Sequence, residues 1–541
     1  MNSRIRIAAI LLLGFAATLL AVDFGRRQEN LYASAASETT GKENTAGTIS
    51  ESGPSPSTDI ELSRQIERAI KDSPFAGARW GVFVMSLEDG RVLSSRDGDK
   101  LFTPASNMKI YTTAVALDLL GADYRWRTSV YAPAEPDASG NITGDVTLYG
   151  RGAPDLVSQT KEKNPSLVEL ADALYARGVR RIKGNVVGDE SHFRGNQFGD
   201  GWLWNDVQWY FGAEASALSI NSNEVDLNIT PASTSGSPAT VAINRRADYF
   251  RIVNNVVTGA PGIPTRVGIA RGQSDNEFVV WGEFPAGGKG FGAHLSVSNP
   301  ALWAATLFRD ALVARGIVVE GQVVRRDFRG VVTERFDPQR AIELAAVTSK
   351  SLGEIVTETN KKSINLYAEL ILRTLGKERG VLAPVLDPTK ARERGDDEAG
   401  LAVIRIWLER AGIPAGNLAL HDGSGLSRLD LVSPEVTTRL LAAMAKRPAS
   451  TIFRGSLPVG GKDGTLASRL TATNGRIAAK TGSLTYDDSL SGYATTSDGR
   501  VLAFSIDCND ATSRGNSISV IDKIASVIAS YSSTSQKTSK K

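Results

Sequence analysis

The chain has 541 residues, which exceeds one ordinary domain and is enough to bury a large core. Hydrophobic residues make up 41% and charged residues 22%, a balance typical of globular proteins. The formal net charge of +3 is small for this length. Nucleic-acid binding, which would need clustered lysine and arginine, therefore has no support as a function.

The N-terminal region is expected to precede the folded body. Arg4 and Arg6 stand before an apolar run over 7–22, a pattern typical of an export signal. Residues 1–29 are interpreted as a signal peptide or an N-terminal membrane anchor, and both alternatives stay open. The protein is thus expected to be exported to the periplasm or another extracytoplasmic space. Residues 30–58 are rich in Ser, Thr, Ala, Gly and Glu, which predicts a flexible linker.

The folded body is predicted to begin with a helix, a hairpin and a second helix. The first helix starts near Asp59, and apolar residues recur on one face of it. Strands over 81–86 and 92–94 flank a turn at 88–90, which indicates a β-hairpin. A helix over 104–121 follows, because it begins with proline and ends at glycine.

After residue 128 the sequence predicts short strands and two helices, with many glycines and asparagines. The two helices share a pattern, since residues 172–179 are echoed by residues 310–317. Each is followed by a glycine and a short valine-rich strand. We interpret them as related helix–strand units, with convergence on a common helix-end pattern as the alternative; two copies are too few for a solenoid.

Helical patterns return after residue 347 and give way to strands. Helices are predicted over 351–375, 398–411 and 433–446, strands over 477–480, 490–496 and 501–507, and a last helix over 518–528. The Ser/Lys-rich tail 532–541 is expected to be disordered. The predicted fold class is therefore α+β and multidomain. Residues 59–128 and 347–531 form one discontinuous domain, interrupted by a β-rich insertion over 129–346 that is expected to hold two subdomains.

Ser106 and Lys109 are three residues apart on the predicted helix, so their side chains project from one face. A serine hydroxyl is a weak nucleophile until a base removes its proton, and a lysine can do so only when it is neutral. Burial on a mostly apolar helix lowers the pKa of a lysine. The pair is a candidate nucleophile and base. The alternative is a helix cap with a solvated lysine, and the same spacing at Ser158 and Lys161 shows how common the pattern is.

A second candidate element is the run Lys480, Thr481, Gly482 and Ser483, which follows a short predicted strand. A glycine on a strand marks a place where another backbone or a ligand comes close. The lysine supplies positive charge, and the threonine and serine add hydroxyls beside backbone donors. An ordinary strand end is the alternative interpretation.

The third candidate element is Ser363 and Asn365, separated by one residue at the start of the returning helical part. The identical tripeptide over 219–221 lies in an alternating, strand-like stretch of the insertion, with no helix beside it. We select Ser363 because it belongs to the interrupted domain that also carries the other two elements.

The order Ser-x-x-Lys, Ser-x-Asn, Lys-Thr-Gly is the signature of penicillin-binding proteins and serine β-lactamases. More closely, the sequence resembles the low-molecular-mass class C penicillin-binding proteins, which are D-alanyl-D-alanine carboxypeptidases and endopeptidases. In that family a long insertion separates the first and second motifs of the transpeptidase domain. The resemblance covers about residues 59–530, and further matching stretches are 422–428 with 433–434, 457–460 with 463–466, and 216–218 with Asn221 and Asn223.

The resemblance implies an antiparallel sheet flanked by helices and a covalent acyl-enzyme mechanism. Ser106 would attack the carbonyl between two D-alanines, and Lys109 would take its proton. Backbone N–H groups of Ser106 and Ser483 would form the oxyanion hole. Ser363 would relay a proton to the leaving D-alanine, with Lys480 as electrostatic support.

The same resemblance assigns the remaining site residues. Asn365 would bind the substrate amide or hold Lys109, while Thr481, Gly482 and Ser483 would bind the terminal carboxylate of the substrate. The implied partners are peptidoglycan peptides as substrates and β-lactams as covalent inhibitors. Neither a metal nor an organic cofactor is implied. The histidines are too scattered in sequence to suggest a ligand set: His192, His294 and His421.

One departure from the family concerns the start of the insertion. Relatives often carry an acidic residue there in a Gly-Asp-Pro stretch, whereas residues 152–155 read Gly-Ala-Pro-Asp. Asp155 is the candidate substitute. Two other functions remain as alternatives: a β-lactamase or esterase of the same superfamily, and a non-catalytic wall-binding protein that keeps the fold.

Overall fold

The computed structural model describes residues 59–158, 166–244, 247–330, 336–380, 395–512 and 517–532. The predicted export signal and linker, residues 533–541 of the predicted tail, and Lys161 lie outside these ranges. Within them, no helix combines the length and the apolar character that crossing a membrane requires.

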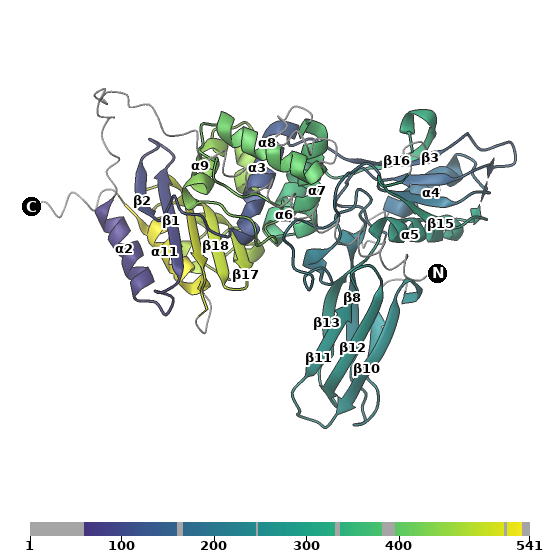
Figure 1. Cartoon of the computed structure of the whole chain (residues 1–541), viewed down its shortest axis with the longest axis horizontal. Coiled ribbons are helices and arrows are strands. Elements are labelled where there is room, and N and C mark those ends of the chain that lie inside the picture. Colours follow the sequence, from purple (N-terminus) through teal and green to yellow (C-terminus); the bar gives the residue numbers. More distant parts are fainter. Residues whose placement is uncertain are drawn as a thin grey trace, which may run out of the picture. The chain divides into compact units, whose positions relative to one another are not determined.

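A five-stranded antiparallel sheet combines the beginning and the end of the described chain (Figure 1). Its strands, in spatial order, are β17 (Ile477–Leu484), β18 (Asp487–Thr495), β19 (Val501–Asn509), β1 (Arg79–Ser86) and β2 (Val92–Arg96). The predicted hairpin is confirmed as β1 and β2, and the three predicted closing strands are present. Strand β17 continues four residues beyond Lys480, so the whole Lys480–Ser483 run is part of the sheet.

Two helices pack on one face of this sheet. Helix α2 (Ile60–Lys71) begins at Asp59, whose carboxylate accepts hydrogen bonds from the N–H groups of the first turn. Helix α11 (Ile518–Ser530) lies against α2, β18 and β19. Their apolar faces and the facing sides of the strands form one buried cluster, which includes Cys508.

The opposite face carries the helices around Ser106. Helix α3 (Met108–Leu120) is buried along most of its length and contacts its neighbours α6, α7, α8 and α9. The surrounding helices are α6 (Leu352–Lys362), α7 (Asn365–Arg379), α8 (Asp396–Arg410), α9 (Pro434–Met444) and α10 (Ser450–Ser456). The helical pattern predicted over 351–375 is therefore two helices. The chain breaks at Ser363, whose φ of 59° lies in the left-handed region.

The chain between α3 and α6 builds separate sheets. The largest is mixed, with β15 (Val323–Arg326), β7 (Val186–Asp189), β5 (Val146–Tyr149), β3 (Arg127–Ala132) and β16 (Ile342–Thr348) in that spatial order. Beside it lies a small parallel sheet of β14 (Val318–Val319), β6 (Arg181–Ile182) and β4 (Asn141–Ile142). Helices α4 (Ser166–Ala176) and α5 (Pro300–Ala314) pack against each other beside these sheets, and their apolar sides enter a common core.

The two predicted helix–strand units pair in parallel and in register, and a third copy joins them. Strands β6 and β7 pair with β14 and β15, while β4 and β5 add the same strand–turn–strand unit on the other side. The turns stack closely at Gly144, Gly184 and Gly321. A Cβ on Gly184 would lie 2.3 Å from the carbonyl carbon of Gly144, so only glycine permits this stacking.

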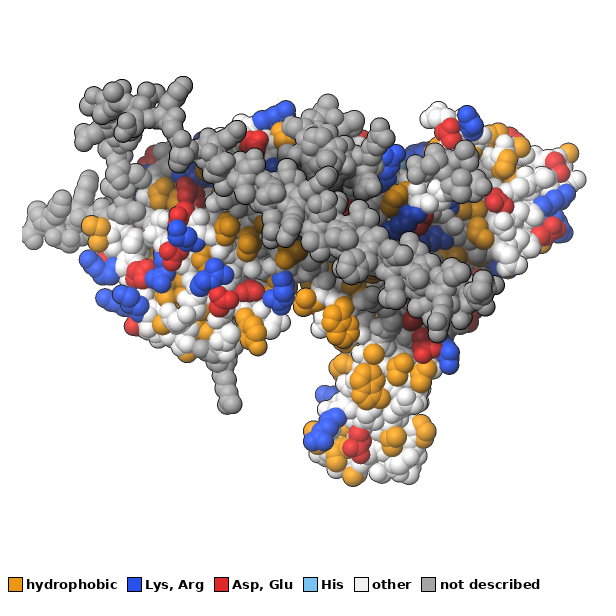
Figure 2. All heavy atoms as spheres, in the orientation of Figure 1, with side chains coloured by type: hydrophobic (Ala, Val, Ile, Leu, Met, Phe, Trp, Pro, Cys, Tyr) orange, Lys and Arg blue, Asp and Glu red, His pale blue; other side chains and the backbone are white. Residues whose placement is uncertain are grey.

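Two three-stranded sheets complete the insertion (Figure 1). One contains β13 (Phe291–Ser296), β8 (Glu224–Thr230) and β9 (Thr240–Ile243), and the other β10 (Arg251–Gly259), β12 (Glu277–Pro285) and β11 (Arg266–Arg271). Hydrophobic side chains are visible on the surface of this part in Figure 2. Trp281 of β12 and Phe291 of β13 are partly exposed.

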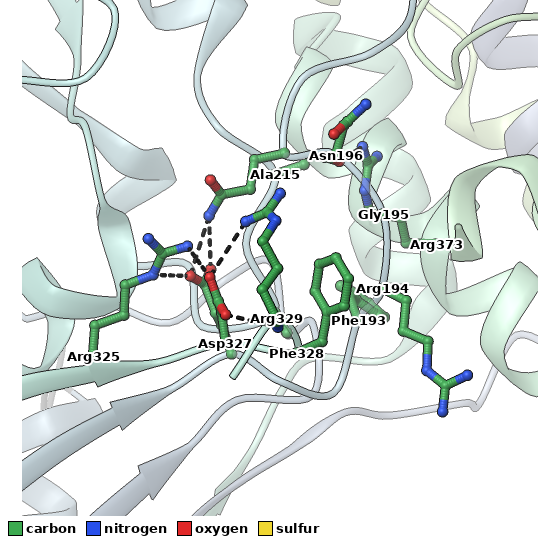
Figure 3. A pocket seen from close by; sticks show the side chains of 13 residues that line it. Phe193, Arg194, Gly195, Asn196, Ala215, Arg325, Asp327, Phe328, Arg329 and Arg373 are labelled. Carbon is green, nitrogen blue, oxygen red and sulfur yellow. Dashed lines mark hydrogen bonds and ion pairs between the residues drawn. The ribbon is translucent and has the colours of Figure 1, made fainter. Parts of the chain in front are cut away.

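The segment after β7 joins the large mixed sheet to the helices around α3. Arg373 of α7 is buried and donates a hydrogen bond of 3.0 Å to the carbonyl of Asn196. On the sheet side, Arg325 and Arg329 both pair with Asp327 (Figure 3). The buried Arg373 side chain thus ties the insertion to α7.

Candidate active site

Ser106 lies in a short 3₁₀ turn, Ala105–Asn107, immediately before α3. Ala105 has a φ of 49°, which is uncommon for a residue other than glycine and indicates local backbone strain. Two glycines allow other segments to approach this turn. A Cβ on Gly425 would lie 1.8 Å from the Ala105 oxygen, and one on Gly482 would lie 2.7 Å from the Pro104 oxygen. Both positions therefore need glycine.

Polar side chains of the five-stranded antiparallel sheet form hydrogen bonds with the segment over 103–107. Asn509 pairs with both backbone polar groups of Thr103, Ser489 donates to the carbonyl of Pro104, and the amide of Asn107 donates to the Ser491 hydroxyl. All of these sheet residues lie on β18 and β19. The turn that carries the candidate nucleophile is consequently fixed to the sheet at Thr103, Pro104 and Asn107.

Lys109 is fully buried, and its Nζ is surrounded by three oxygens. The atom lies 3.0 Å from Oγ of Ser106, 2.6 Å from Oδ1 of Asn365 and 2.7 Å from the carbonyl oxygen of Ser424. A neutral amine has two N–H bonds and one lone pair. Because the amide and carbonyl oxygens can only accept, they take the two hydrogens, and the lone pair is left facing the Ser106 hydroxyl.

The electrostatic surroundings of Lys109 favour this neutral form. Burial lowers its pKa from the ordinary value to about 7, while the negative charges of Asp422 and Glu369 act in the opposite direction. An amine with a pKa near 7 is neutral in a substantial fraction of molecules at neutral pH. Lys109 is thus suited to accept a proton from Ser106.

Lys480 is the second buried lysine, and its Nζ lies 2.9 Å from Oγ of Ser363. It also donates a 2.8 Å hydrogen bond to the carbonyl of Thr481. Burial, followed by the charge of Lys109, holds the pKa of Lys480 well below its usual range. The break between α6 and α7 is what turns the Ser363 hydroxyl toward this lysine.

Asn365 is the first residue of α7, and the insertion determines the orientation of its amide. Its Nδ2 donates a 2.9 Å hydrogen bond to the carbonyl of Phe211, which leaves Oδ1 to accept from Lys109. Phe211 belongs to the insertion, so this contact was not foreseeable from the motif alone.

The hydroxyls of the Lys480–Ser483 run already have partners within the protein. Thr481 shares a 2.7 Å hydrogen bond with Thr465, a residue that the sequence analysis did not single out. Ser483 is exposed and donates to a carboxylate oxygen of Asp488 at 2.7 Å. Gly482 lies between them, and a Cβ there would be 3.0 Å from the backbone nitrogen of Ser106. Strand β17 therefore runs directly past the candidate nucleophile.

A cleft of about 900 Å³ brings these elements together. Ser106, Ser363, Asn365, Ser483 and Thr465 line it, while Lys109 and Lys480 are buried close by through their contacts with Ser106 and Ser363. The insertion, helix α6 and a neighbouring loop supply the other walls, which include Leu203, Tyr210, Phe211, Glu224, His294, Glu358 and Arg428. All three predicted motifs thus converge on one cavity.

The second copies of the two sequence motifs, at Ser158 and at residues 219–221, contact each other. Ser158 donates its backbone N–H to Oδ1 of Asn221 at 3.0 Å, and the Asn221 amide donates to the Ser158 hydroxyl at 2.9 Å. Neither residue lines the cleft. The choice of Ser106 and Ser363 over these positions agrees with the geometry.

Asp155, the candidate substitute for the family's acidic residue, also does not line the cleft. Its carboxylate accepts a 2.9 Å hydrogen bond from the backbone N–H of Lys350. Burial raises the pKa of this carboxyl. The structure therefore gives Asp155 a contact just before the start of α6, outside the set of residues that line the cleft.

The histidines are dispersed, each with its own partner: His192 beside Tyr149, His294 with Asp226, and His421 with Asp200. Across the described ranges, no group of three or more His, Cys, Asp or Glu side chains is arranged to hold a metal ion.

Sequence reasoning did not find the function of Asp422 within the Asp-Gly-Ser-Gly-Leu-Ser stretch. Its buried carboxylate accepts hydrogen bonds from the N–H groups of Ser424, Gly425 and Ser427. These bonds shape the loop so that the Ser424 carbonyl points at Lys109. The signal was present, because aspartate followed by small residues commonly folds back onto its own backbone.

The chain is similar to known proteins over most of its length. The D-Ala-D-Ala carboxypeptidase 3 (S13) family matches residues 62–530. A relative from Actinomadura named D-alanyl-D-alanine carboxypeptidase is 34% identical over 484 residues, which is 87% of this chain and 85% of the relative.

Solved structures show the same fold. Penicillin binding protein 4 (dacB) from Haemophilus influenzae has a TM-score of 0.74 and 24% identity, over 86% of this chain and 99% of that one. Its complex with a β-lactam has a TM-score of 0.68 and 21% identity, over 86% and 100%. The α+β fold class expected from the sequence is confirmed. The chain belongs to the D-Ala-D-Ala carboxypeptidase 3 (S13) family.

Proposed function

We propose that this protein is a serine D-alanyl-D-alanine carboxypeptidase, D,D-endopeptidase or both, which hydrolyses peptidoglycan peptides through an acyl-enzyme at Ser106. The observation that carries the proposal is the position of Lys109. A buried amine with a lowered pKa lies 3.0 Å from the Ser106 hydroxyl, and its hydrogens are taken by two fixed acceptors.

In the acylation step, Lys109 accepts the Ser106 proton while Oγ attacks the carbonyl carbon of the penultimate D-alanine. The negative charge that develops on the carbonyl oxygen is met by the backbone N–H groups of Ser106 and Ser483. Strand β17 supports this arrangement, because Gly482 lies against the Ser106 nitrogen. Removing one such donor typically costs about 3–4 kcal/mol of transition-state stabilisation.

The C–N bond then breaks, and the leaving amine needs a proton. Ser363 is placed to relay to it the proton that Lys109 took from Ser106, since the Ser363 hydroxyl contacts Lys480 and the residue lines the same cleft as Ser106. This transfer returns Lys109 to its neutral form. The product of this step is a free D-alanine, or a second peptide when the substrate is a cross-link. Water attacks the ester next, with Lys109 as base, and releases the shortened peptide.

Substrate recognition is proposed to use the β17 side of the cleft. The hydroxyls of Thr481 and Ser483 would bind the terminal carboxylate, and each must share or exchange its present partner to do so. β-Lactams are proposed to acylate Ser106 as well, by analogy with the complex formed by the Haemophilus influenzae protein.

The cellular setting follows from this substrate. We propose that residues 1–29 direct export or anchor the chain and that the folded part acts outside the cytoplasm, where peptidoglycan is found. We also propose 59–128 with 347–531 as the catalytic domain and 129–346 as its insertion.

The direct test is release of D-alanine from a peptide ending in D-Ala-D-Ala by the full chain and by Ser106→Ala. A cross-linked dimer is assayed in parallel to measure endopeptidase activity. Wild-type hydrolysis of either substrate, lost in Ser106→Ala, supports the proposal. Rapid turnover of penicillin with no peptide hydrolysis would indicate a β-lactamase. Absence of both reactions would indicate a non-catalytic protein.

A further inference from the structure

The segment over 199–212 of the insertion reaches the catalytic lysine from two directions. Leu203, Tyr210 and Phe211 on this segment line the cleft. Two other contacts leave the segment toward the catalytic helices, one from the side chain of Trp202 and one from the backbone of Phe211. The contact from Phe211 ends on Asn365, which is bonded to Lys109. The contact from Trp202 ends on Asp422, which shapes the loop whose carbonyl is bonded to Lys109.

The first contact runs through Asp422. The indole Nε1–H of Trp202 donates a 2.8 Å hydrogen bond to Oδ2 of this buried carboxylate. Asp422 holds the loop whose Ser424 carbonyl accepts from Lys109. The approach of the indole is tight, since a Cβ on Gly199 would lie 2.3 Å from Nε1 and 3.0 Å from Cβ of Asp422.

The second contact runs through Asn365. Because the Phe211 carbonyl accepts from Nδ2, the amide is held with Oδ1 toward Lys109. A flipped amide would present N–H groups to the lysine and could not accept from it. The insertion segment thus supports both acceptors that take the hydrogens of neutral Lys109.

We infer that the 199–212 segment is a positioning element for the catalytic base, in which Trp202 acts through Asp422 and Ser424, and Phe211 acts through Asn365, to aim the lone pair of Lys109 at Ser106. The inference rests on the proposed function. It gives the insertion a part in the chemistry beyond forming a wall of the cleft.

The charged groups around Lys109 define how its titration responds to a change at Trp202. Asp422 and Glu369 face it with negative charge, and Lys480 faces it from β17. Asp430 contacts Asp422, and Arg373 pairs with Glu369. If the indole donor is lost, the loop that Asp422 shapes is less well held, and so is the Ser424 carbonyl that accepts from Lys109. Weakening this acceptor disfavours the ammonium form and moves the pKa of Lys109 downward.

The experiment measures the second-order rate constant for acylation by a chromogenic β-lactam from pH 5 to 9. Trp202→Phe keeps an aromatic ring and removes the N–H donor. Gly199→Ala keeps Trp202 and displaces it from Asp422. Trp204→Phe is the matched control, because Trp204 lies two residues away with 77% of its side chain exposed.

For Trp202→Phe and Gly199→Ala we expect the rate plateau to fall about tenfold, which corresponds to about 1.4 kcal/mol, and its midpoint to move to lower pH. Trp204→Phe should have the same rate plateau and the same midpoint as the wild type. A wild-type plateau and midpoint in both variants would overturn the inference. So would a lower plateau with an unmoved midpoint, since that would indicate only general damage to the fold. If wild type itself shows no acylation, the proposed function fails instead.

Discussion

Two fully buried lysines lie close together in this site, and their hydrogen-bond partners are neutral oxygens. Burial disfavours the charged form of both, and the charge of Lys109 further disfavours that of Lys480. This arrangement explains how Lys109 can act as a base at neutral pH while Lys480 sits beside Ser363.

The first prediction concerns the pH dependence of acylation. The reactive form has neutral Lys109, whose pKa is about 7, so the acylation rate constant should rise with pH and level off above about 8. Below pH 6 it should fall about tenfold for each pH unit. Stopped-flow measurement with a β-lactam checks this. A rate that is flat or falls between pH 5 and 8 would contradict Lys109 as the base.

The second prediction concerns Gly482. A Cβ at this position would meet Oγ of Ser489 at 2.3 Å and the Pro104 oxygen at 2.7 Å, so Gly482→Ala must push β17 away from the Ser106 turn. Because a displacement of about 1 Å in a catalytic site can cost a hundredfold, acylation should fall by roughly that factor. Gly455→Ala on α10 is the control, since nothing lies within 4 Å of its Cβ. Equal acylation rates in the two variants would refute the close approach.

At the scale of elements, strand β19 shows how one strand serves two environments. Ile506 and Cys508 enter the apolar core beneath α2 and α11, whereas Ser505, Asp507 and Asn509 face the Ser106 turn. Ser505 joins Ser491 to the carboxyl of Asp507, and Ser491 bonds to Asn107. A buried polar network therefore backs the nucleophile.

The third prediction is that Asp507→Asn gains stability relative to wild type as pH rises. Burial raises the pKa of Asp507 to about 7, well above its value in an unfolded chain. Between about pH 4 and 7 the native state keeps a proton that the unfolded state has lost, so wild-type stability falls as pH rises through this window. Asparagine cannot ionise. Thermal unfolding at pH 4, 6 and 8 checks the prediction, with exposed Asp123→Asn as the control for losing one carboxyl. A stability difference that does not change with pH would contradict it.

Most elements were predictable because local patterns agree with the fold. Asp59 caps α2, Gly90 turns the first hairpin, and the periodic apolar residues of α3 and α9 are buried. The break at Ser363 was not predictable, since the helical pattern continues on both sides of it. The contacts that accompany the break are tertiary: Ser363 with Lys480, and Asn365 with Phe211. The third copy of the strand–turn–strand unit was missed because no helix precedes it.

In the site, too, features that depend on tertiary contacts could not be predicted from the sequence. The three motifs identified Ser106, Lys109, Ser363, Asn365 and Lys480, and the structure brings them together. Asp422, Thr465 and the backbone of Phe211 were missed as contributors. Their contacts connect residues far apart in sequence. A contact made by a backbone carbonyl does not depend on the residue type, so the sequence carries no sign of it.

In the whole molecule, the insertion is joined to the helices around α3 by contacts of α7. Arg373 of α7 is central, because it pairs with Glu369 at 2.8 Å and donates to the carbonyl of Asn196. Glu369 in turn accepts from the N–H of Gly423, next to Asp422. A single buried ion pair thus connects the insertion, α7 and the loop that shapes the surroundings of Lys109.

The fourth prediction is that Arg373→Met lowers the free energy of unfolding by roughly 3–5 kcal/mol, because it leaves Glu369 buried without its partner. Arg64→Met is the control. Arg64 pairs with Glu61 on the surface of α2, and both side chains are mostly exposed, so the cost there should be below about 1 kcal/mol. Urea denaturation followed by intrinsic fluorescence measures both. Similar costs for the two variants would show that the buried pair is not what joins these parts.

The role of Ser106 is tested most directly by the mass of the intact protein after incubation with a β-lactam, followed by peptide mapping. We expect one added β-lactam per chain, attached to Ser106 and absent from Ser106→Ala. Folded wild-type protein that gains no mass at saturating β-lactam, or gains it at another residue, would contradict Ser106 as the activated nucleophile.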